Sequence, residues 1–220
     1  MKKPKIFIAC DTTRLSKVRR ILKFTKSTKM KIGYKFGLEF MNSKNGRPFI
    51  SKLKNKIIFV DLKLNDTVNT MLSAVKALKD LKINYLTVHI SSGLAALKAV
   101  KKVAGSIKII GVTTLTSLNN KDLKLIGYNK SVKSLVIHQA KLAKTAALDA
   151  LVCSPYEVAA VRKIFKKEII TPGIQIGKKN YDQKRSMEAS EVKSDWLVIG
   201  RAITKGNIKK NIQNLAKDLR

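Results

Sequence analysis

The residues with the clearest chemical potential form the run Asp61-Leu62-Lys63-Leu64-Asn65-Asp66, which directly follows an apolar segment. If that segment is a β-strand, Asp61 and Lys63 point to the same face, because side chains alternate along a strand. Asp66 then falls just beyond the strand, where the chain turns toward a helical pattern. Interleaved acids and bases on one face suit proton transfer and the stabilisation of a developing charge. One such pair is reasonable as a buried salt bridge, but the second carboxylate favours a catalytic site.

Polar side chains also recur at the carboxyl ends of other apolar runs. In chain order these are Asp11, Lys31, His89, Thr116, Gln175 together with Gln183, and Gly200-Arg201. In a parallel barrel the active site forms where the strands end and the following loops begin. We therefore expect these positions to surround one pocket with Asp61, Lys63 and Asp66.

The last apolar run is followed by features of a phosphate site. Gly200 permits close backbone approach, Arg201 supplies a fork of donors, and a helical pattern starts there. A Gly-Arg pair before a helix is weak evidence alone. The turn Pro172-Gly173 follows the seventh candidate strand, however, and the loops after strands seven and eight are the usual phosphate cradle of a barrel. Together these features predict a phosphate-bearing substrate.

The elements that must position these residues alternate along the chain. Short β-branched apolar runs predict strands at 6–10, 30–33, 57–62, 85–90, 107–112, 150–153, 168–171 and 196–199. Apolar residues three and four apart predict helices at 68–81, 94–103, 132–147, 156–165 and 203–219. This α/β alternation predicts a (β/α)8 TIM barrel that occupies residues 1–220 as a single domain. An open doubly wound sheet is the alternative, but the turn after the first strand, Asp11-Thr12-Thr13, is not glycine-rich.

The composition is that of a globular and strongly basic protein. The chain has 220 residues, of which 45% are hydrophobic, and its 46 Lys+Arg against 14 Asp+Glu give a formal charge of +32. The 38 lysines far outnumber the 8 arginines and are spread over the whole chain, and aromatic residues make up only 6%. These features disfavour a specific nucleic-acid interface. The positive field should still attract polyanionic small molecules in a salt-dependent way.

Neither a membrane span nor an export signal is expected. No apolar stretch approaches the roughly 20 residues that span a bilayer, and the run at 6–10 is too short for a signal peptide. Cys10 and Cys153 lie far apart and each ends an apolar run. This placement indicates two buried, reduced thiols in a cytoplasmic protein, and the absence of clustered Cys and His argues against a zinc site.

Taken together, the motifs resemble the orotidine 5′-phosphate decarboxylase family, most closely its bacterial branch. The resemblance covers nearly the whole chain, in the family's order and spacing. The matching stretches are Ile8-Ala9-Cys10-Asp11, Lys31-Ile32-Gly33, Asp61-Leu62-Lys63-Leu64-Asn65-Asp66, Thr87-Val88-His89, Val112-Thr113-Thr114-Leu115-Thr116-Ser117, Val152-Cys153-Ser154, Thr171-Pro172-Gly173-Ile174, Asp182-Gln183-Lys184-Arg185 and Ile199-Gly200-Arg201-Ala202-Ile203-Thr204.

The resemblance implies an enzyme without cofactor or metal that converts orotidine 5′-phosphate to UMP and CO2, the last step of de novo UMP synthesis. It implies a charge network of Lys31, Asp61, Lys63 and Asp66, in which Lys63 protonates C6 of the pyrimidine. Asp66 would reach in from the other subunit of a homodimer. The other implied substrate contacts are Asp11 and Lys31 at the ribose, Thr116 and Ser117 at the pyrimidine, Gln183, Gly200 and Arg201 at the phosphate, and Thr67 and Thr70 within the lining block 61–70.

Two positions depart from the family's pattern. The loop Asn65-Asp66-Thr67-Val68-Asn69-Thr70 lacks the usual proline. Gln175 stands where the family has an arginine after Pro-Gly-Ile. Gln175 could still hydrogen-bond the phosphate, and Lys178 or Lys179 could supply the missing charge.

Two other functions stay open. The related Mg²⁺-dependent 3-keto-L-gulonate 6-phosphate decarboxylases and hexulose phosphate synthases share the Asp-x-Lys-x-x-Asp pattern. They carry an additional acidic ligand near the end of strand two, where this chain is expected to have Lys31. A basic nucleic-acid-binding protein would bind arbitrary duplex DNA with a steep salt dependence, but that function leaves the ordered motifs unexplained.

Overall fold

The computed structural model describes residues 5–26, 28, 30–175, 187–188 and 191–218. Eight parallel strands close into a barrel in the order β1-β10-β7-β6-β5-β4-β3-β2. They are β1 (Lys5–Ala9), β2 (Ile32–Gly37), β3 (Ile57–Leu64), β4 (Tyr85–His89), β5 (Lys108–Val112), β6 (Ala150–Val152), β7 (Glu168–Thr171) and β10 (Trp196–Ile199). This closed ring confirms the predicted (β/α)8 barrel and excludes the open doubly wound sheet.

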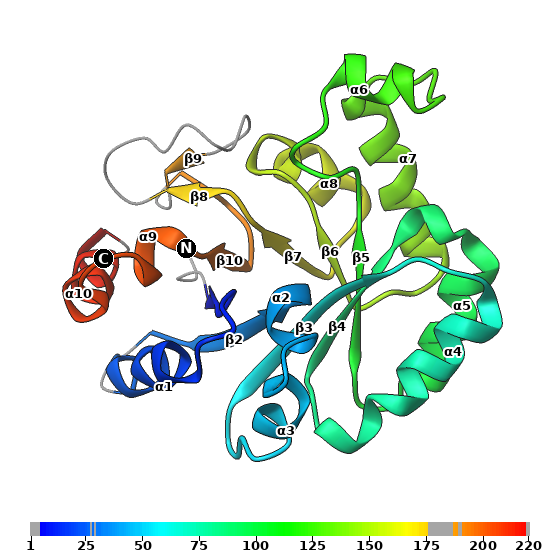
Figure 1. The fold of residues 1–220 in the computed structure, drawn as a ribbon. Coiled ribbons are helices and arrows are strands. Elements are labelled where there is room, and N and C mark those ends of the chain that lie inside the picture. Colours follow the sequence, from blue (N-terminus) through cyan, green and yellow to red (C-terminus); the bar gives the residue numbers. More distant parts are fainter. Residues whose placement is uncertain (1–4, 27, 29, 176–186, 189–190, 219–220) are drawn as a thin grey trace.

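Helices surround the strands (Figure 1). They are α1 (Leu15–Phe24), α2 (Leu38–Met41), α3 (Gly46–Ile50), α4 (Val68–Ala77), α5 (Leu94–Val103), α6 (Asn120–Leu125), α7 (Val132–Thr145), α8 (Val158–Ile164), α9 (Arg201–Thr204) and α10 (Ile208–Asp218). Short 3-10 turns at Lys79–Leu81, Ile90–Ser92 and Pro155–Glu157 extend or precede some of them. A two-stranded sheet of β8 (Ile174–Gln175) and β9 (Met187–Glu188) lies outside the barrel ring. Within the described residues, no helix is long and apolar enough to cross a bilayer.

Toward the amino-terminal ends of the strands, the inward-facing side chains fill the barrel with aromatic rings. Phe7 stacks on Trp196 with 3.9 Å between ring centroids, and it meets Phe59 and Tyr85 edge to face. A Cβ atom on Gly33 would lie 2.5 Å from the Phe7 ring, so only glycine fits at that inward position. This packed layer closes the inside of the barrel, and the next inward positions of the same strands lie nearer the carboxyl ends.

The amino-terminal end of the barrel is closed by one carboxylate. Glu168 accepts hydrogen bonds from Lys5 (2.8 Å), Tyr85 (2.8 Å), Lys108 (3.0 Å) and Trp196 (3.2 Å). Burial by itself would raise the pKa of Glu168, but these donors prevail and lower it from 4.5 to about 2. The cluster therefore ties β1, β4, β5, β7 and β10 together through charge-assisted hydrogen bonds.

One expected strand is displaced, the helices α1, α2, α3 and α6 were not predicted, and the single helix expected at 203–219 is divided into α9 and α10. The strand expected at 30–33 is β2, which begins at Ile32 and continues to Gly37. The helix α1 was not predicted, although Leu15, Val18 and Ile21 follow its buried face at three-residue spacing. The shift of β2 changes which lysine reaches the carboxyl end of the barrel.

Candidate active site

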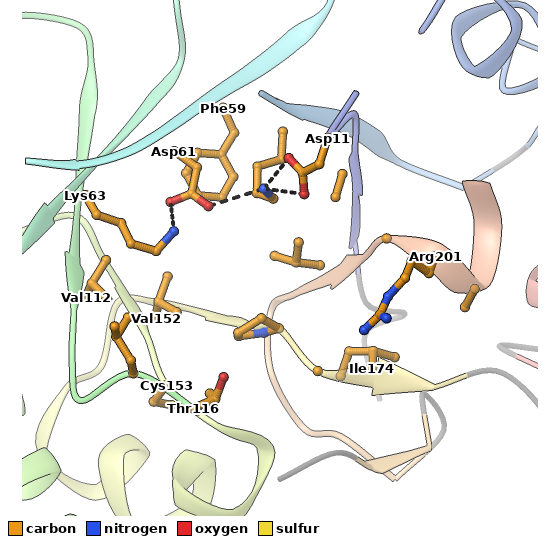
Figure 2. Close-up of a pocket in the computed structure, with 18 of the residues that line it drawn as sticks. Asp11, Phe59, Asp61, Lys63, Val112, Thr116, Val152, Cys153, Ile174 and Arg201 are labelled. Carbon is orange, nitrogen blue, oxygen red and sulfur yellow. Dashed lines mark hydrogen bonds and ion pairs between the residues drawn. The ribbon is translucent and has the colours of Figure 1, made fainter. Parts of the chain in front are cut away.

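A pocket of about 350 Å³ opens at the carboxyl ends of the barrel strands. Its wall includes Asp11, Lys35, Asp61 and Lys63 on the side of β1 to β3. Figure 2 shows Asp61 and Lys63 on one side of the pocket and Arg201 on another. Apolar groups from β5, β6 and β10 cover much of the remaining wall. A ligand in this pocket can therefore meet a charged network at one end and an arginine at the other.

The charged side is a continuous chain of ion pairs. The Lys35 ammonium lies 3.0 Å from Asp11 Oδ1 and 3.3 Å from Asp61 Oδ2. The Lys63 ammonium donates to the other Asp61 oxygen, Oδ1, at 2.9 Å. Two carboxylates and two ammoniums thus alternate from β1 across β2 to β3, and each charge has an opposite neighbour.

The network keeps Asp61 and Lys35 ionised at neutral pH. Burial alone would raise the pKa of Asp61, but Lys35, Lys63 and the hydrogen bonds that Asp61 accepts hold this pKa below its usual value. Burial alone would lower the pKa of Lys35, but Asp61 and Asp11 raise it above its usual value. Burial and the charge of Lys63 lower the pKa of His89, so this nearby imidazole is neutral at pH 7.

A bulge in β3 aims Lys63 at Asp61. The register between β3 and β4 passes from Val60↔Leu86 to Leu64↔Val88, so β3 advances four residues while β4 advances two. Inside this bulge Lys63 has φ +50°, a left-handed conformation that non-glycine residues seldom adopt. Its backbone N–H donates to the Thr87 hydroxyl oxygen at 2.9 Å, and the Thr87 hydroxyl donates to Asp61 Oδ1 at 3.0 Å. Strain of this kind concentrates at functional sites.

The expected role of Lys31 in this network is wrong. Lys31 is exposed and precedes β2, so it lies at the amino-terminal rim of the barrel, away from the pocket. Lys35 occupies the expected place, because it shares the inward face of β2 with Gly33 and lies two residues nearer the strand's carboxyl end. Lys35 is the site residue that the sequence prediction missed.

The structure brings together only part of the remaining predicted set. Asp11, Asp61, Lys63, Thr116, Gly200 and Arg201 line the pocket. Asp66, Thr67, Thr70 and Ser117 are exposed and do not line it in this single chain, and the Asp66 carboxylate accepts the Thr67 N–H at 2.6 Å. The backbone of Gln175 belongs to β8. Gln183, Lys178 and Lys179 lie outside the described residues.

Both cysteines are buried free thiols, as the sequence predicts. Cys153 lines the pocket (Figure 2), whereas Cys10 is fully enclosed. Burial, with a smaller contribution from Asp11, raises the pKa of Cys10 to about 12, so this thiol is not nucleophilic. Within the part of the chain that the structure describes, no group of three or more His, Cys, Asp or Glu side chains is arranged to hold a metal ion.

A closed (β/α)8 barrel with a lysine–carboxylate network at its carboxyl rim defines a barrel enzyme. The chain belongs to the orotidine 5′-phosphate decarboxylase / HUMPS family, whose pattern matches residues 4–212. It is 42% identical over 212 residues to orotidine 5′-phosphate decarboxylase of Wolbachia pipientis subsp. Culex pipiens, covering 92% of each chain. Identity to the enzyme of the same name from Coxiella burnetii is 35% over 234 residues, covering 99% of this chain and 97% of the relative.

Solved structures that bear this enzyme's name share the fold. Orotidine 5′-phosphate decarboxylase from Lactobacillus acidophilus superposes with a TM-score of 0.82 at 29% identity and full coverage of both chains. An inhibitor-bound orotidine 5′-monophosphate decarboxylase from Methanocaldococcus jannaschii has a TM-score of 0.81 at 23% identity, a likeness that concerns the fold.

Proposed function

We propose that this chain, acting as one domain, is an orotidine 5′-phosphate decarboxylase that releases CO2 and forms UMP, the last step of de novo UMP synthesis. The observation that carries the proposal is the Lys35–Asp61–Lys63 network, in which Lys35 and Asp61 are buried, at the carboxyl rim of a barrel of this family. Relatives with 35–42% identity over most of the chain bear the name of this activity.

The reaction needs a fixed positive charge beside C6 of the pyrimidine. When the bond between C6 and the carboxylate breaks, the electron pair stays on C6 in the ring plane, where no π-system can spread it. The Lys63 ammonium stabilises this carbanion and then transfers a proton to C6, and solvent reprotonates the lysine. Asp61, placed against the leaving carboxylate, also disfavours the bound ground state. Asp61 further holds the Lys63 ammonium in one orientation through the 2.9 Å contact.

The rest of the substrate is assigned to the other residues of the family's motifs. Asp11 and Lys35 bind the ribose hydroxyls, and Thr116 faces the pyrimidine. Ser117, which is exposed and does not line the pocket in this single chain, is a contact that the family resemblance alone implies. The phosphate lies at Gly200 and Arg201, together with Gln183 and Gln175. Because this grip is remote from C6, its binding energy can close loops and exclude water from the reacting end.

Asp66, Thr67 and Thr70 complete the site from the partner subunit of a homodimer. In the single chain, every residue from Asn65 to Thr70 is exposed. Val68 in this segment and Leu38 at the start of α2 are exposed apolar residues, 37% and 54% accessible, which suits a contact surface. The dimer would bury these groups and deliver the second carboxylate of the motif to Lys63.

No cofactor, metal, membrane or specific nucleic acid is required by this proposal, and a biosynthetic enzyme for a free nucleotide belongs in the cytoplasm. The Mg²⁺-dependent relatives need an acidic ligand near the end of strand two. Here that position carries Lys35, whose ammonium already bridges Asp11 and Asp61 and would repel a divalent cation.

The test is a spectrophotometric decarboxylation assay with orotidine 5′-phosphate, run with and without EDTA. Turnover that survives the chelator supports the proposal. Turnover of 3-keto-L-gulonate 6-phosphate that depends on Mg²⁺, with none of orotidine 5′-phosphate, would replace it with the alternative activity of the superfamily. Tight binding of arbitrary duplex DNA with no decarboxylation of either compound would refute both.

A further inference from the structure

We infer that the Thr87 hydroxyl is a positioning group for the decarboxylation, because it locks the Lys63 backbone and the Asp61 carboxylate into one arrangement. Thr87 lies on β4 and is fully buried inside the barrel. The kinetic part of this inference rests on the proposed function, whereas its structural part does not.

The Thr87 hydroxyl is both a hydrogen-bond acceptor and a hydrogen-bond donor. It accepts the Lys63 N–H at 2.9 Å and donates its own hydrogen to Asp61 Oδ1 at 3.0 Å. The direction is fixed, because an ionised carboxylate can only accept a hydrogen bond and a backbone N–H can only donate one. Asp61 Oδ1 also receives the Lys63 ammonium at 2.9 Å. The three residues therefore form a closed ring of hydrogen bonds around the proton donor.

The bulge explains why a side chain is needed there. Between Val60 and Leu64 the regular ladder to β4 is interrupted, and the Lys63 N–H points to the Thr87 hydroxyl in place of a backbone carbonyl. Lys63 is at φ +50°, a left-handed conformation that a non-glycine residue keeps only where its surroundings hold it. The Thr87 hydroxyl supplies the bond that makes this conformation favourable.

Loss of the hydroxyl should disturb the reacting groups and leave the distant phosphate grip intact. Valine at position 87 keeps the shape of threonine but leaves the Lys63 N–H unpaired in a largely buried place. The bulge can then relax, and the ammonium moves relative to C6. A displacement of about 1 Å in a reacting group can lower the rate on the order of 100-fold. The apolar groups of β5, β6 and β10 and Arg201 at the start of α9 belong to other elements and stay in place.

The experiment compares Thr87→Val, Thr87→Ser and a matched control, Thr113→Val. Thr113 is a buried threonine directly after β5, and among the described residues its hydroxyl donates to the Val152 carbonyl, which also accepts the Thr113 N–H. For Thr87→Val we expect kcat to fall about 10- to 100-fold, with KM and the Kd for UMP within about threefold of wild type. Thr87→Ser should recover most of kcat, and Thr113→Val should match wild type.

A pH profile separates positioning from a purely structural role. The Thr87 hydrogen bond is one of the contacts that lower the pKa of Asp61. In Thr87→Val the acid limb of the kcat profile should therefore move to higher pH, and in Thr87→Ser it should not. A kcat within about twofold of wild type in Thr87→Val would overturn the inference. So would a loss that serine does not rescue, or one that Thr113→Val reproduces.

Hydrogen exchange at the Lys63 amide tests the same ring without any turnover. Protection should be lost in Thr87→Val and kept in Thr87→Ser and Thr113→Val. If wild type fails to decarboxylate orotidine 5′-phosphate while this pattern of protection holds, the proposed function is wrong and the hydrogen-bonded ring stands. If the Lys63 amide is equally protected in all variants, the ring itself is wrong.

Discussion

The Lys35 ammonium lies 3.3 Å from a carboxylate oxygen of Asp61, and the two side chains are each only 11% exposed. They come from neighbouring strands, β2 and β3, so the contact joins the two strands at the rim of the pocket. Breaking a buried ion pair by removing one partner leaves an uncompensated charge, which is far more harmful than loss of an exposed pair. Lys35 therefore supports both the geometry of the site and the ionisation of Asp61.

The contact between Lys35 and Asp61 predicts different effects for substitutions of Lys35 and of Lys31. Lys35→Ala should lower kcat/KM for orotidine 5′-phosphate at least 100-fold, because Asp11 and Asp61 then face each other without a cation between them. Lys31→Ala should be within about twofold of wild type, since Lys31 is exposed before β2. Steady-state kinetics of both variants tests this difference. A severe loss of kcat/KM in Lys31→Ala would mean that Lys31, and not Lys35, belongs to the charge network.

Lys63→Ala should abolish turnover, with kcat reduced by about 1,000-fold or more, because the variant lacks both the fixed charge beside C6 and the transferable proton. UMP should still bind, because the phosphate end of the pocket is unchanged. Single-turnover kinetics together with calorimetric UMP titration measures the two properties separately. Strong residual turnover in a variant that binds UMP normally would reject Lys63 as the proton donor.

Mixing two inactive variants tests the shared site. Lys63→Ala and Asp66→Ala homodimers should each be inactive, but a heterodimer places both substitutions in one site and leaves the other site intact. After unfolding and refolding of an equal mixture, activity should return to about a quarter of wild type, since half the dimers are mixed and each has one working site. Mixtures that stay inactive although size-exclusion chromatography shows dimers would place Asp66 outside the site.

Stability at low pH should depend on Glu168. Its folded pKa of about 2 lies below the ordinary 4.5, so the stabilisation is fully present above pH 4.5 and is lost as pH falls from 4.5 toward 2. Glu168→Gln should lower Tm at pH 7 on the order of 5 °C, and the gap to wild type should narrow below pH 4. Asp80→Asn is the control, because its pair with Arg47 is well exposed and contributes little. If the difference in Tm between wild type and Glu168→Gln stayed constant across this pH range, ionised Glu168 would not be the source of the stabilisation.

A basic hollow beside the active site predicts salt-dependent substrate capture. Its lining includes Arg14, Lys17, Arg20 and Lys205, and it shares Thr204 with the active-site pocket. None of the described residues that line the hollow carries a carboxylate. Because orotidine 5′-phosphate is a polyanion, cations at this place raise its local concentration near the phosphate end of the pocket.

Charge reversal measures this effect. The double variant Lys17→Glu with Arg20→Glu should lower kcat/KM about tenfold at low ionic strength, leave kcat unchanged, and lose most of the difference near 0.5 M salt. Lys98→Glu with Lys141→Glu makes the same change of net charge on α5 and α7, which lie on another side of the barrel (Figure 1), and should have a much smaller effect. Equal losses in the two double variants would mean that only net charge matters.

The barrel could be predicted from sequence because strands buried on both faces leave continuous apolar runs. The strands expected at 168–171 and 196–199 coincide with β7 and β10, and the helix expected at 94–103 coincides with α5. Each run ends at a polar or glycine residue, which marks the rim where the pocket forms. The placement of Asp11, Asp61, Lys63 and Arg201 around one pocket follows from that rule.

Lys35 was missed for a different physical reason. Residues 31, 33 and 35 share one face of a strand, so alternation alone cannot separate Lys31 from Lys35. The choice depends on where the strand ends, and an apolar-run criterion stops at Gly33 because a lysine follows Tyr34. In the barrel this lysine is tolerated inside because Asp11 and Asp61 neutralise it.

The hydrogen-bonded ring of Asp61, Lys63 and Thr87 could not be predicted from the pattern of any single strand either. Its members come from β3 and β4, and Thr87 is 24 residues from Lys63 in sequence. The register shift that joins them is a property of the two strands together. Alternation along one strand does not indicate that the Thr87 hydroxyl meets a backbone amide of the neighbouring strand.

At Lys63 the left-handed backbone lowers the stability of the fold, whereas the side chain is needed for catalysis. Glycine at this position would relax the chain and make the bulge more robust, yet it would carry no ammonium. Stability and catalysis therefore make opposite demands on residue 63, and the left-handed conformation is the cost of an ammonium at this place.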